Sequence, residues 1–179
     1  MHANDRTAER DHVVAAAVQR AESLLDRGAP LREVLSQLTG AVETLSNGTT
    51  VASILALDRE GLLRNGASPS LPADYLDQID RLRPDPAVGT CAAAAATGRI
   101  VLTPDFHADE KWRELRHLPL AIGFRGAWSM PLKDEAGRVV GTFGTYFRES
   151  RQPTGQEVED VTALAPVAAR AISRHARRV

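Results

Sequence analysis

The sequence predicts an α+β domain in which helices at both ends of the chain pack against a central antiparallel sheet. Three observations predict this class. Apolar residues recur every three or four positions as far as Leu45 and again after Thr154, which indicates amphipathic helices. Between them, short β-compatible runs are separated by turns rich in Gly, Pro and Asp, as in antiparallel strands. Short helical segments interrupt the strands, which gives the order of elements expected of an α+β fold.

The first two helices are defined by their apolar stripes. Gly28 ends the first helix, since glycine readily adopts the left-handed conformation that closes helices, and Pro30 suits the first turn of the next. The second stripe runs up to the Asn47-Gly48 turn. The stripes consist of Val14, Ala17, Val18, Ala21, Leu24 and Leu25 in the first helix, and of Leu31, Val34, Leu35, Leu38, Val42 and Leu45 in the second.

Two hairpins and three helical segments are expected in the middle of the chain. In order, they are strands over residues 51–57 and 62–67, helices over 73–82 and 91–97, a strand over 100–103, a helix over 109–118, and strands over 128–132 and 139–147. Thr90 is placed to cap the helix at residue 91, and Gly98 is placed to end it. In the last hairpin, alternation puts Trp128, Met130 and Leu132 on one side of the first strand. It likewise puts five residues on one side of the second strand: Val139, Gly141, Phe143, Thr145 and Phe147.

The last helix begins at a capping box formed by Thr154 and Glu157. Its apolar residues follow a heptad seam, which, with the stripe of the first helix, predicts a helical bundle between two copies of the chain. The seam consists of Val158, Val161, Ala165, Ala168 and Ile172.

Composition narrows the classes of partner. Hydrophobic residues make up 43% and charged residues 25% of 179 residues, with a net charge of −1, so no overall field attracts nucleic acid or an anionic membrane. The RHARR segment near the C-terminus reflects the preference of helix ends for positive charge rather than a nucleic-acid site. The polar N-terminus lacks the apolar segment of a signal peptide, and no apolar run is long enough to span a bilayer, so we expect a cytoplasmic protein. One cysteine, Cys91, excludes an internal disulfide.

The middle of the chain resembles the ligand-facing half of a GAF sensory domain. The resemblance rests on the order and spacing of GTCAAAAATG, PDF, DEKW and WSMPLKDEAGRVVGTFGTYF, and it extends from about Pro30 to Ile172. It implies that the terminal helices lie on one face of the sheet, and that the segments between Pro69 and Gly123 roof a pocket on the other. Residues 1–29 are then an N-terminal helix for dimerisation, and residues 30–179 are the GAF-like domain with its C-terminal helix.

Four residues of the expected roof and hairpin are candidates for contact with a small ligand. Cys91 starts a predicted helix, where the helix dipole favours a reactive thiolate; the alternative is a small buried apolar residue. Trp112, Trp128 and Phe143 fall in the elements around the expected pocket, where aromatic rings commonly line ligand sites, or they pack in the core. Tyr146 has the opposite strand parity from Phe143, so both cannot face one cavity without a bulge.

Two polar residues complete the candidate set. Arg125, before the fourth strand of the chain, and Ser129, within it, could anchor a carboxylate or phosphate through charge-assisted hydrogen bonds. The alternative is an exposed arginine and an ordinary strand serine. No set of residues predicts a metal site or identifies a cofactor.

These observations favour a sensory domain that binds an unidentified small molecule and biases its terminal helices, as a homodimer, with a separate or fused output domain. We expect no catalytic activity. Two alternatives stay open: a thiol-dependent enzyme of the free methionine sulfoxide reductase type that uses Cys91, and a dimerisation module that binds nothing. The enzyme would have no second cysteine to resolve its intermediate. Ala92 stands where bilin-binding relatives carry histidine, and the Asn-Lys of cyclic-nucleotide-binding relatives is missing, which disfavours both ligands.

Overall fold

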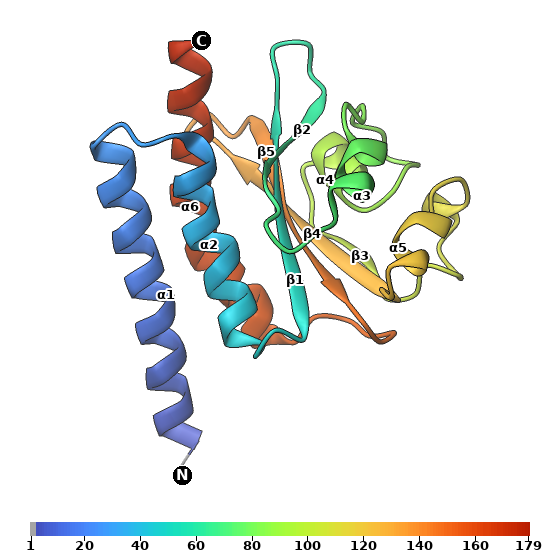
Figure 1. The fold of residues 1–179 in the computed structure, drawn as a ribbon, viewed down its shortest axis with the longest axis horizontal. Coiled ribbons are helices and arrows are strands. Elements are labelled where there is room, and N and C mark those ends of the chain that lie inside the picture. Colours follow the sequence, from blue (N-terminus) through green and yellow to red (C-terminus); the bar gives the residue numbers. More distant parts are fainter. Residues whose placement is uncertain (1–2) are drawn as a thin grey trace.

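The protein is built in three layers, with a sheet between two sets of helices (Figure 1). The computed structural model describes residues 3–179. One face of the sheet is covered by α2 (Leu31–Leu45) and α6 (Gly155–Arg178), and α1 (Ala3–Asp26) packs mainly against these two helices. The other face is covered by a roof of short helices: α3 (Ala73–Ile79), α4 (Cys91–Thr97), the 3-10 turn η1 (Glu110–Trp112) and α5 (His117–Ala121). This is the predicted α+β class.

The sheet is antiparallel, and its strands lie in the order β2-β1-β5-β4-β3. Its strands are β1 (Thr50–Leu57), β2 (Leu63–Ala67), β3 (Val101–Thr103), β4 (Gly126–Lys133) and β5 (Val139–Phe147). Both predicted hairpins are confirmed, as β1–β2 and β4–β5. The first and last hairpins meet at the centre of the sheet, where Ile54 of β1 is paired with Phe143 of β5.

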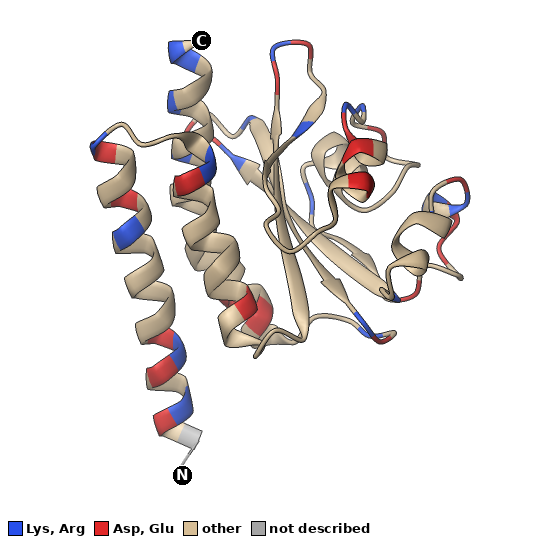
Figure 2. Cartoon of the chain, viewed as in Figure 1, with Lys and Arg blue, Asp and Glu red and all other residues tan. Residues whose placement is uncertain are grey.

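Alternate residues of the central strands enter two separate cores. Trp128, Met130 and Leu132 of β4 pack with Phe143 and Phe147 of β5 against the helix layer, which confirms that these residues of each strand share a side. The placement of Val139 with Phe143 is wrong: Val139 packs on the roof side and Val140 against the helix layer, next to an irregularity in the β4–β5 register. Tyr146 enters the other core, under the roof, so its opposite parity to Phe143 is also confirmed. Because both faces are covered, the strands carry few charges, and Figure 2 shows the charged residues mainly on helices and loops.

The apolar stripe of α6 is used within the chain. Val161, Ala168 and Ile172 are buried in the core between α6 and the sheet, and the remaining seam residues are partly buried against it. The reason given above for a helical bundle between two copies is therefore wrong for α6, because its stripe is already covered. Within residues 3–179, no helix has both the length and the apolar character needed to cross a membrane.

The inner face of α1 is apolar and its flanks are charged. Its residues Val14, Ala17, Ala21 and Leu25 are buried against the helix layer. Ion pairs tie it to α6 along its length: Arg10 with Asp160, Glu22 with Arg170 at 2.5 Å, and Asp26 with Arg174 at 3.3 Å.

Two predicted helices of the roof are shorter than expected. The helix expected over residues 73–82 ends at Ile79, because Leu82 accepts a backbone hydrogen bond from Leu63 of β2 and the intervening Arg81 adopts a positive φ of 64°. The helix expected over residues 109–118 is divided into η1 and α5. Pro119 has no N–H to donate to the preceding turn, which favours a break there, and it lies in the first turn of α5, where proline is accommodated.

Candidate functional site

The roof side of the sheet carries a small polar cluster under α4, formed by Cys91, Ser129, Thr142 and Gly144. The three sheet residues point away from the helix layer because they alternate with Trp128, Met130, Phe143 and Thr145. Ser129 of β4 is the register partner of Gly144 of β5, so the two lie side by side beneath the helix. A Cβ at Gly144 would meet the Cys91 Sγ at 3.1 Å, which is tighter than ordinary van der Waals contact, so a larger residue fits there only if the thiol shifts.

The Cys91 thiol is held in its neutral form. Burial raises its pKa above the ordinary value of 9.0, and contacts with the hydroxyls of Ser129 and Thr142 offset this only in part. Both hydroxyls are buried and have no well-aligned hydrogen-bond partner among the described residues, so the thiol is the polar group that faces them. A protonated thiol is a weak nucleophile, and the helix start does not make this one reactive.

Trp112 is fixed by a chain of buried hydrogen bonds that joins the roof to the edge of the sheet. Its indole Nε1 donates to the Thr90 hydroxyl at 2.8 Å, and the hydroxyls of Thr90 and Thr103 are 2.8 Å apart. The Thr103 hydroxyl then donates to Asp109 at 2.7 Å. The hydroxyl of Thr90 is thus used here and does not cap α4 as predicted, although Gly98 ends that helix with a positive φ of 64° as expected.

Asp109 closes this chain of hydrogen bonds as a carboxylate. Burial would raise its pKa, but hydrogen bonds from Lys111 and Thr103 outweigh burial and lower the pKa below 3.8. Its Oδ1 accepts from the Lys111 amide at 3.0 Å, which caps η1 and positions Trp112. These hydrogen bonds give Trp112 a structural role, because they anchor the roof to the edge of the sheet.

Elsewhere under the roof, aromatic rings pack together with aliphatic side chains. The hydroxyls of Tyr75 and Tyr146 are 2.8 Å apart in the core, and their rings meet edge to face. Phe124 packs against Tyr146, and Phe106 packs against Trp112 with a distance of 4.6 Å between ring centroids. Burial raises the pKa of both tyrosines, so they stay protonated and bind each other.

The six residues predicted to touch a ligand do not form one site. Cys91 and Ser129 meet in the cluster described above, while Trp112 lies elsewhere under the roof. Trp128 and Phe143 belong to the core on the opposite face, so their placement around a roofed pocket is wrong. The alternation correctly grouped these residues within their strands, but it did not indicate which side faces the roof.

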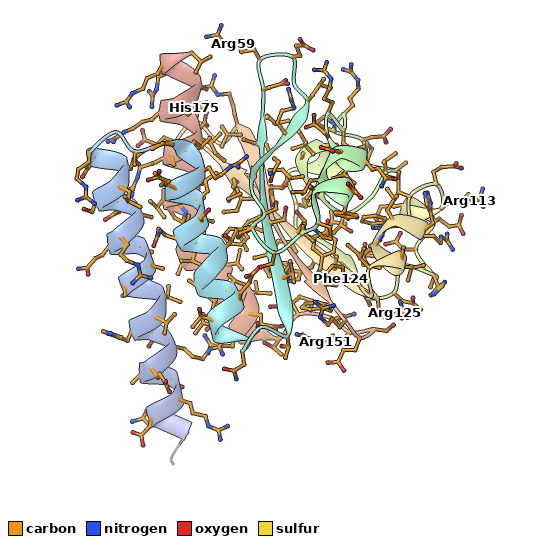
Figure 3. All side chains as sticks on the ribbon, viewed as in Figure 1. Arg59, Arg113, Phe124, Arg125, Arg151 and His175 are labelled. Atoms are coloured by element: carbon orange, nitrogen blue, oxygen red, sulfur yellow. The ribbon has the colours of Figure 1, made fainter. Side chains whose placement is uncertain are left out.

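Arg125 lies on the surface at the start of β4. Its guanidinium donates to the Phe124 carbonyl at 3.2 Å, and Figure 3 shows the two residues side by side, on the part of the molecule far from α1. Thr142 and Gly144 of the cluster are absent from the predicted set. Their parity, opposite to that of Phe143, is the signal that could have identified them. Within residues 3–179, no group of three His, Cys, Asp or Glu side chains is arranged to hold a metal ion.

Comparison with known proteins identifies the family. A family profile described as "GAF domain" matches residues 28–173. The chain belongs to the GAF domain family. The match begins just after α1 and includes the sheet, the roof and most of α6.

Similar proteins include sensors and an enzyme. The methyl sulfide methyltransferase-associated sensor of Methanosarcina acetivorans is 34% identical over 146 residues, which cover 81% of this GAF chain and 14% of that protein. The chain thus spans only a small part of that relative's length.

Among solved structures, a domain of a putative two-component sensor histidine kinase from Sinorhizobium meliloti is 25% identical, with a TM-score of 0.65 and coverage of 82% of this chain and 95% of that one. The free methionine-R-sulfoxide reductase of Neisseria meningitidis, solved with its substrate, is 17% identical, with a TM-score of 0.73 and coverage of 100% of this chain and 97% of that one. At this identity the likeness shows a shared fold.

Proposed function

We propose that this GAF domain is the sensory part of a signalling protein, and that a small molecule bound under the roof biases the arrangement of α1, α2 and α6. The observation that carries the proposal is the alternation of side chains along β4 at the polar cluster, where consecutive residues face opposite sides of the sheet. Ser129, which faces Cys91, lies between Trp128 and Met130, which face the helix layer. A shift of β4 on the roof side therefore also moves side chains that pack against α6.

The polar cluster is the part of the roof side that suits a ligand with hydrogen-bonding groups. Ser129 and Thr142 offer buried hydroxyls without strong partners, and the covering helix α4 is only seven residues long. To reach the hydroxyls, a ligand has to displace the Cys91 thiol and lift α4. It changes the helix layer only to the extent that it binds the lifted arrangement more tightly than the closed one.

We further propose that the domain works as a homodimer through its terminal helices, next to an output domain. The support for dimerisation is α1, the outermost helix of the layer, whose Val13, Val18 and Leu24 are only partly buried. The support for an output domain is the sensor relative, most of which lies outside the matched region.

Native mass spectrometry of the freshly purified chain tests both parts together. We expect a dimer whose mass exceeds that of two chains by a small molecule that is lost on unfolding. A dimer without added mass would support the alternative of a dimerisation module that binds nothing. A bare monomer at micromolar concentration would overturn the proposal.

We also propose that the domain is not a thiol-dependent enzyme. The reductase named above shares the fold, but here the only cysteine of the sequence has a raised pKa and no second thiol to resolve an intermediate. The test is incubation of the chain with free methionine sulfoxide and an excess of dithiothreitol, with Cys91→Ser as the control. We expect no methionine to form above the rate of the control. Turnover that Cys91→Ser abolishes would establish the enzyme instead.

A further inference from the structure

The outer edge of β3 forms a surface that the roof and the helix layer do not use. Among residues 3–179, the large apolar residues that are exposed are Ile100 at 43%, Leu102 at 38% and the terminal Val179. Leu102 is the register partner of Trp128, so it projects toward the side of the helix layer, as does Ile100 two residues earlier. The helices α2 and α6 pack over the other strands, which leaves this apolar pair uncovered at the edge of the sheet.

The backbone groups of the same two residues point out of the sheet. The Ala52 amide of β1 donates to the Glu43 carboxylate, so Ala52 directs its backbone groups away from β5. Steps of two residues through the registers of β1 with β5, β5 with β4 and β4 with β3 then direct the amides and carbonyls of Ile100 and Leu102 outward. Pro131 of β4 agrees with this count, because its nitrogen, which cannot donate, faces the β3 side beyond the end of that strand. Within residues 3–179, these outward groups of β3 form no hydrogen bond.

This edge lacks the features that usually prevent strands from pairing. Native proteins protect the edges of sheets with charged residues, prolines or bulges. Residues 100–103 are Ile-Val-Leu-Thr, without a charge or a proline, and their register with β4 is regular. Arg99 precedes this segment, and Pro104 and Asp105 follow it. The edge therefore suits an added strand of about four residues.

The edge is complementary to itself in the antiparallel direction. A two-fold axis at Val101 places Ile100 of one copy opposite Leu102 of the other, so the two exchange both backbone hydrogen bonds and join their apolar side chains. The same register places Arg99 diagonally across from Asp105 of the other copy. Asp105 accepts a backbone hydrogen bond through its Oδ1, which leaves its Oδ2 for the guanidinium. A parallel arrangement would instead bring equal charges together.

We propose that β3 pairs with β3 of a second copy of this chain, antiparallel and with the two-fold axis at Val101, to form one continuous sheet across both copies. Figure 1 shows β3 on the side of the molecule away from α1, so the contact is separate from the helix layer and does not rest on the function proposed above. A contact this short lies below the about 1,000 Å² of a stable interface, so it forms at high local concentration. It joins pairs of chains that are held by their terminal helices into larger assemblies.

Sedimentation of the full chain from micromolar to millimolar concentration tests the proposal. The mass at micromolar concentration reports the contact between terminal helices, and its increase at higher concentration reports the β3 contact, so the two proposals fail separately. We expect the average mass to rise toward about twice its starting value, and to stay constant in Leu102→Lys, which places a charge in each apolar pair. Circular dichroism checks that this variant is folded. A constant wild-type mass, or an equal rise in Leu102→Lys, would overturn the proposal.

Engineered cysteines test the register in a Cys91→Ala background. Val101→Cys places two thiols across the axis in a pair without backbone hydrogen bonds, where Cα atoms are about 4.5 Å apart, within the range of a disulfide. With oxidised glutathione as the oxidant, we expect Val101→Cys to form a covalent dimer at least about tenfold faster than Leu102→Cys, whose thiols lie on a longer diagonal. Equal rates, or a faster reaction of Leu102→Cys, would overturn the proposal.

A matched pair of arginine variants tests the charge contact. Arg99→Gln should weaken the association about threefold at low salt and have less effect at high salt, as expected for exposed ion pairs. Arg59→Gln, in the exposed turn between β1 and β2, is the control and should leave the association unchanged. Equal effects of the two variants would overturn the antiparallel register.

Discussion

The contact between Gly144 and Cys91 makes a strong prediction about the polar cluster. An alanine Cβ at position 144 would lie 3.1 Å from the Cys91 Sγ, whereas the next nearest atoms, the Trp128 carbonyl oxygen and the Ser129 Oγ, are at ordinary distances of 3.5 and 3.8 Å. The thiol cannot move away without leaving the two hydroxyls. We therefore expect Gly144→Ala to destabilise the wild-type chain by about 1–3 kcal/mol, as overpacking of a core does.

The same change should be harmless once the sulfur is removed. In a Cys91→Ala background the close contact is gone, and alanine in a strand interior is favoured over glycine by about 0.5–1 kcal/mol. The coupling energy of the two substitutions should thus be at least about 1 kcal/mol. Independent mutations deviate from additivity by only about 0.3–0.5 kcal/mol.

Urea unfolding followed by circular dichroism measures the four free energies of this cycle. Gly40→Ala is the matched control, because a Cβ there meets no atom within 4 Å in the middle of α2, and it should stabilise the chain about equally in both backgrounds. If the effects of Gly144→Ala and Cys91→Ala simply add, the thiol does not lie over Gly144, and the description of the cluster is wrong.

Changes in the roof and at the start of α6 have equally definite outcomes. Trp112→Phe removes the hydrogen bond to Thr90 and should lower the free energy of unfolding, measured by urea titration, by about 1–2 kcal/mol. A decrease of less than about 0.3 kcal/mol would show that the chain of hydrogen bonds is not formed. Thr154→Ala removes the side-chain cap of α6 and should lower the melting temperature by a few degrees, given a cost of about 1 kcal/mol, and an unchanged melting temperature would contradict the cap. Burial alone would raise the pKa of Glu157, but hydrogen bonds from Arg151 and Thr154 outweigh burial and hold the pKa below 4.5. The stability that this carboxylate contributes is therefore complete above about pH 4.5, and it is lost as the pH falls through the pKa of the folded state. Glu157→Gln should destabilise the chain at pH 7 and have a smaller effect in acid, and an effect independent of pH would refute this reading.

The sequence was sufficient for the order of the elements because periodicity and turn residues act locally. The stripe that ends at Leu45 and the capping box at Thr154 each define one edge of an element, and both edges lie where predicted. The roof was harder to predict, because its helices are too short for a periodic pattern. There, single residues such as Pro119 and Arg81 set the ends of the helices.

The candidate site was only partly predictable, for a reason that lies in the sheet itself. Alternation identifies the face of a strand when one side is buried and the other is wet, but here both sides are buried, as the burial of Trp128 and Ser129 shows. Aromatic residues commonly line ligand sites, but here Trp128 and Phe143 pack against the helix layer. The roof-side cluster consists of small residues that look unremarkable in a sequence, and their proximity depends on the register between β4 and β5.

The ion pairs between α1 and α6 also fix a direction. The residue numbers of the paired residues increase together, from Arg10 with Asp160 to Asp26 with Arg174, so the two helices run in the same direction. Figure 1 shows the start of α1 and the end of α6 at opposite ends of the helix layer. Domains connected in series through such helices would stack along one axis rather than fold back on each other. A sliding or twisting of α6 in one domain would then be transmitted directly to the first helix of the next domain.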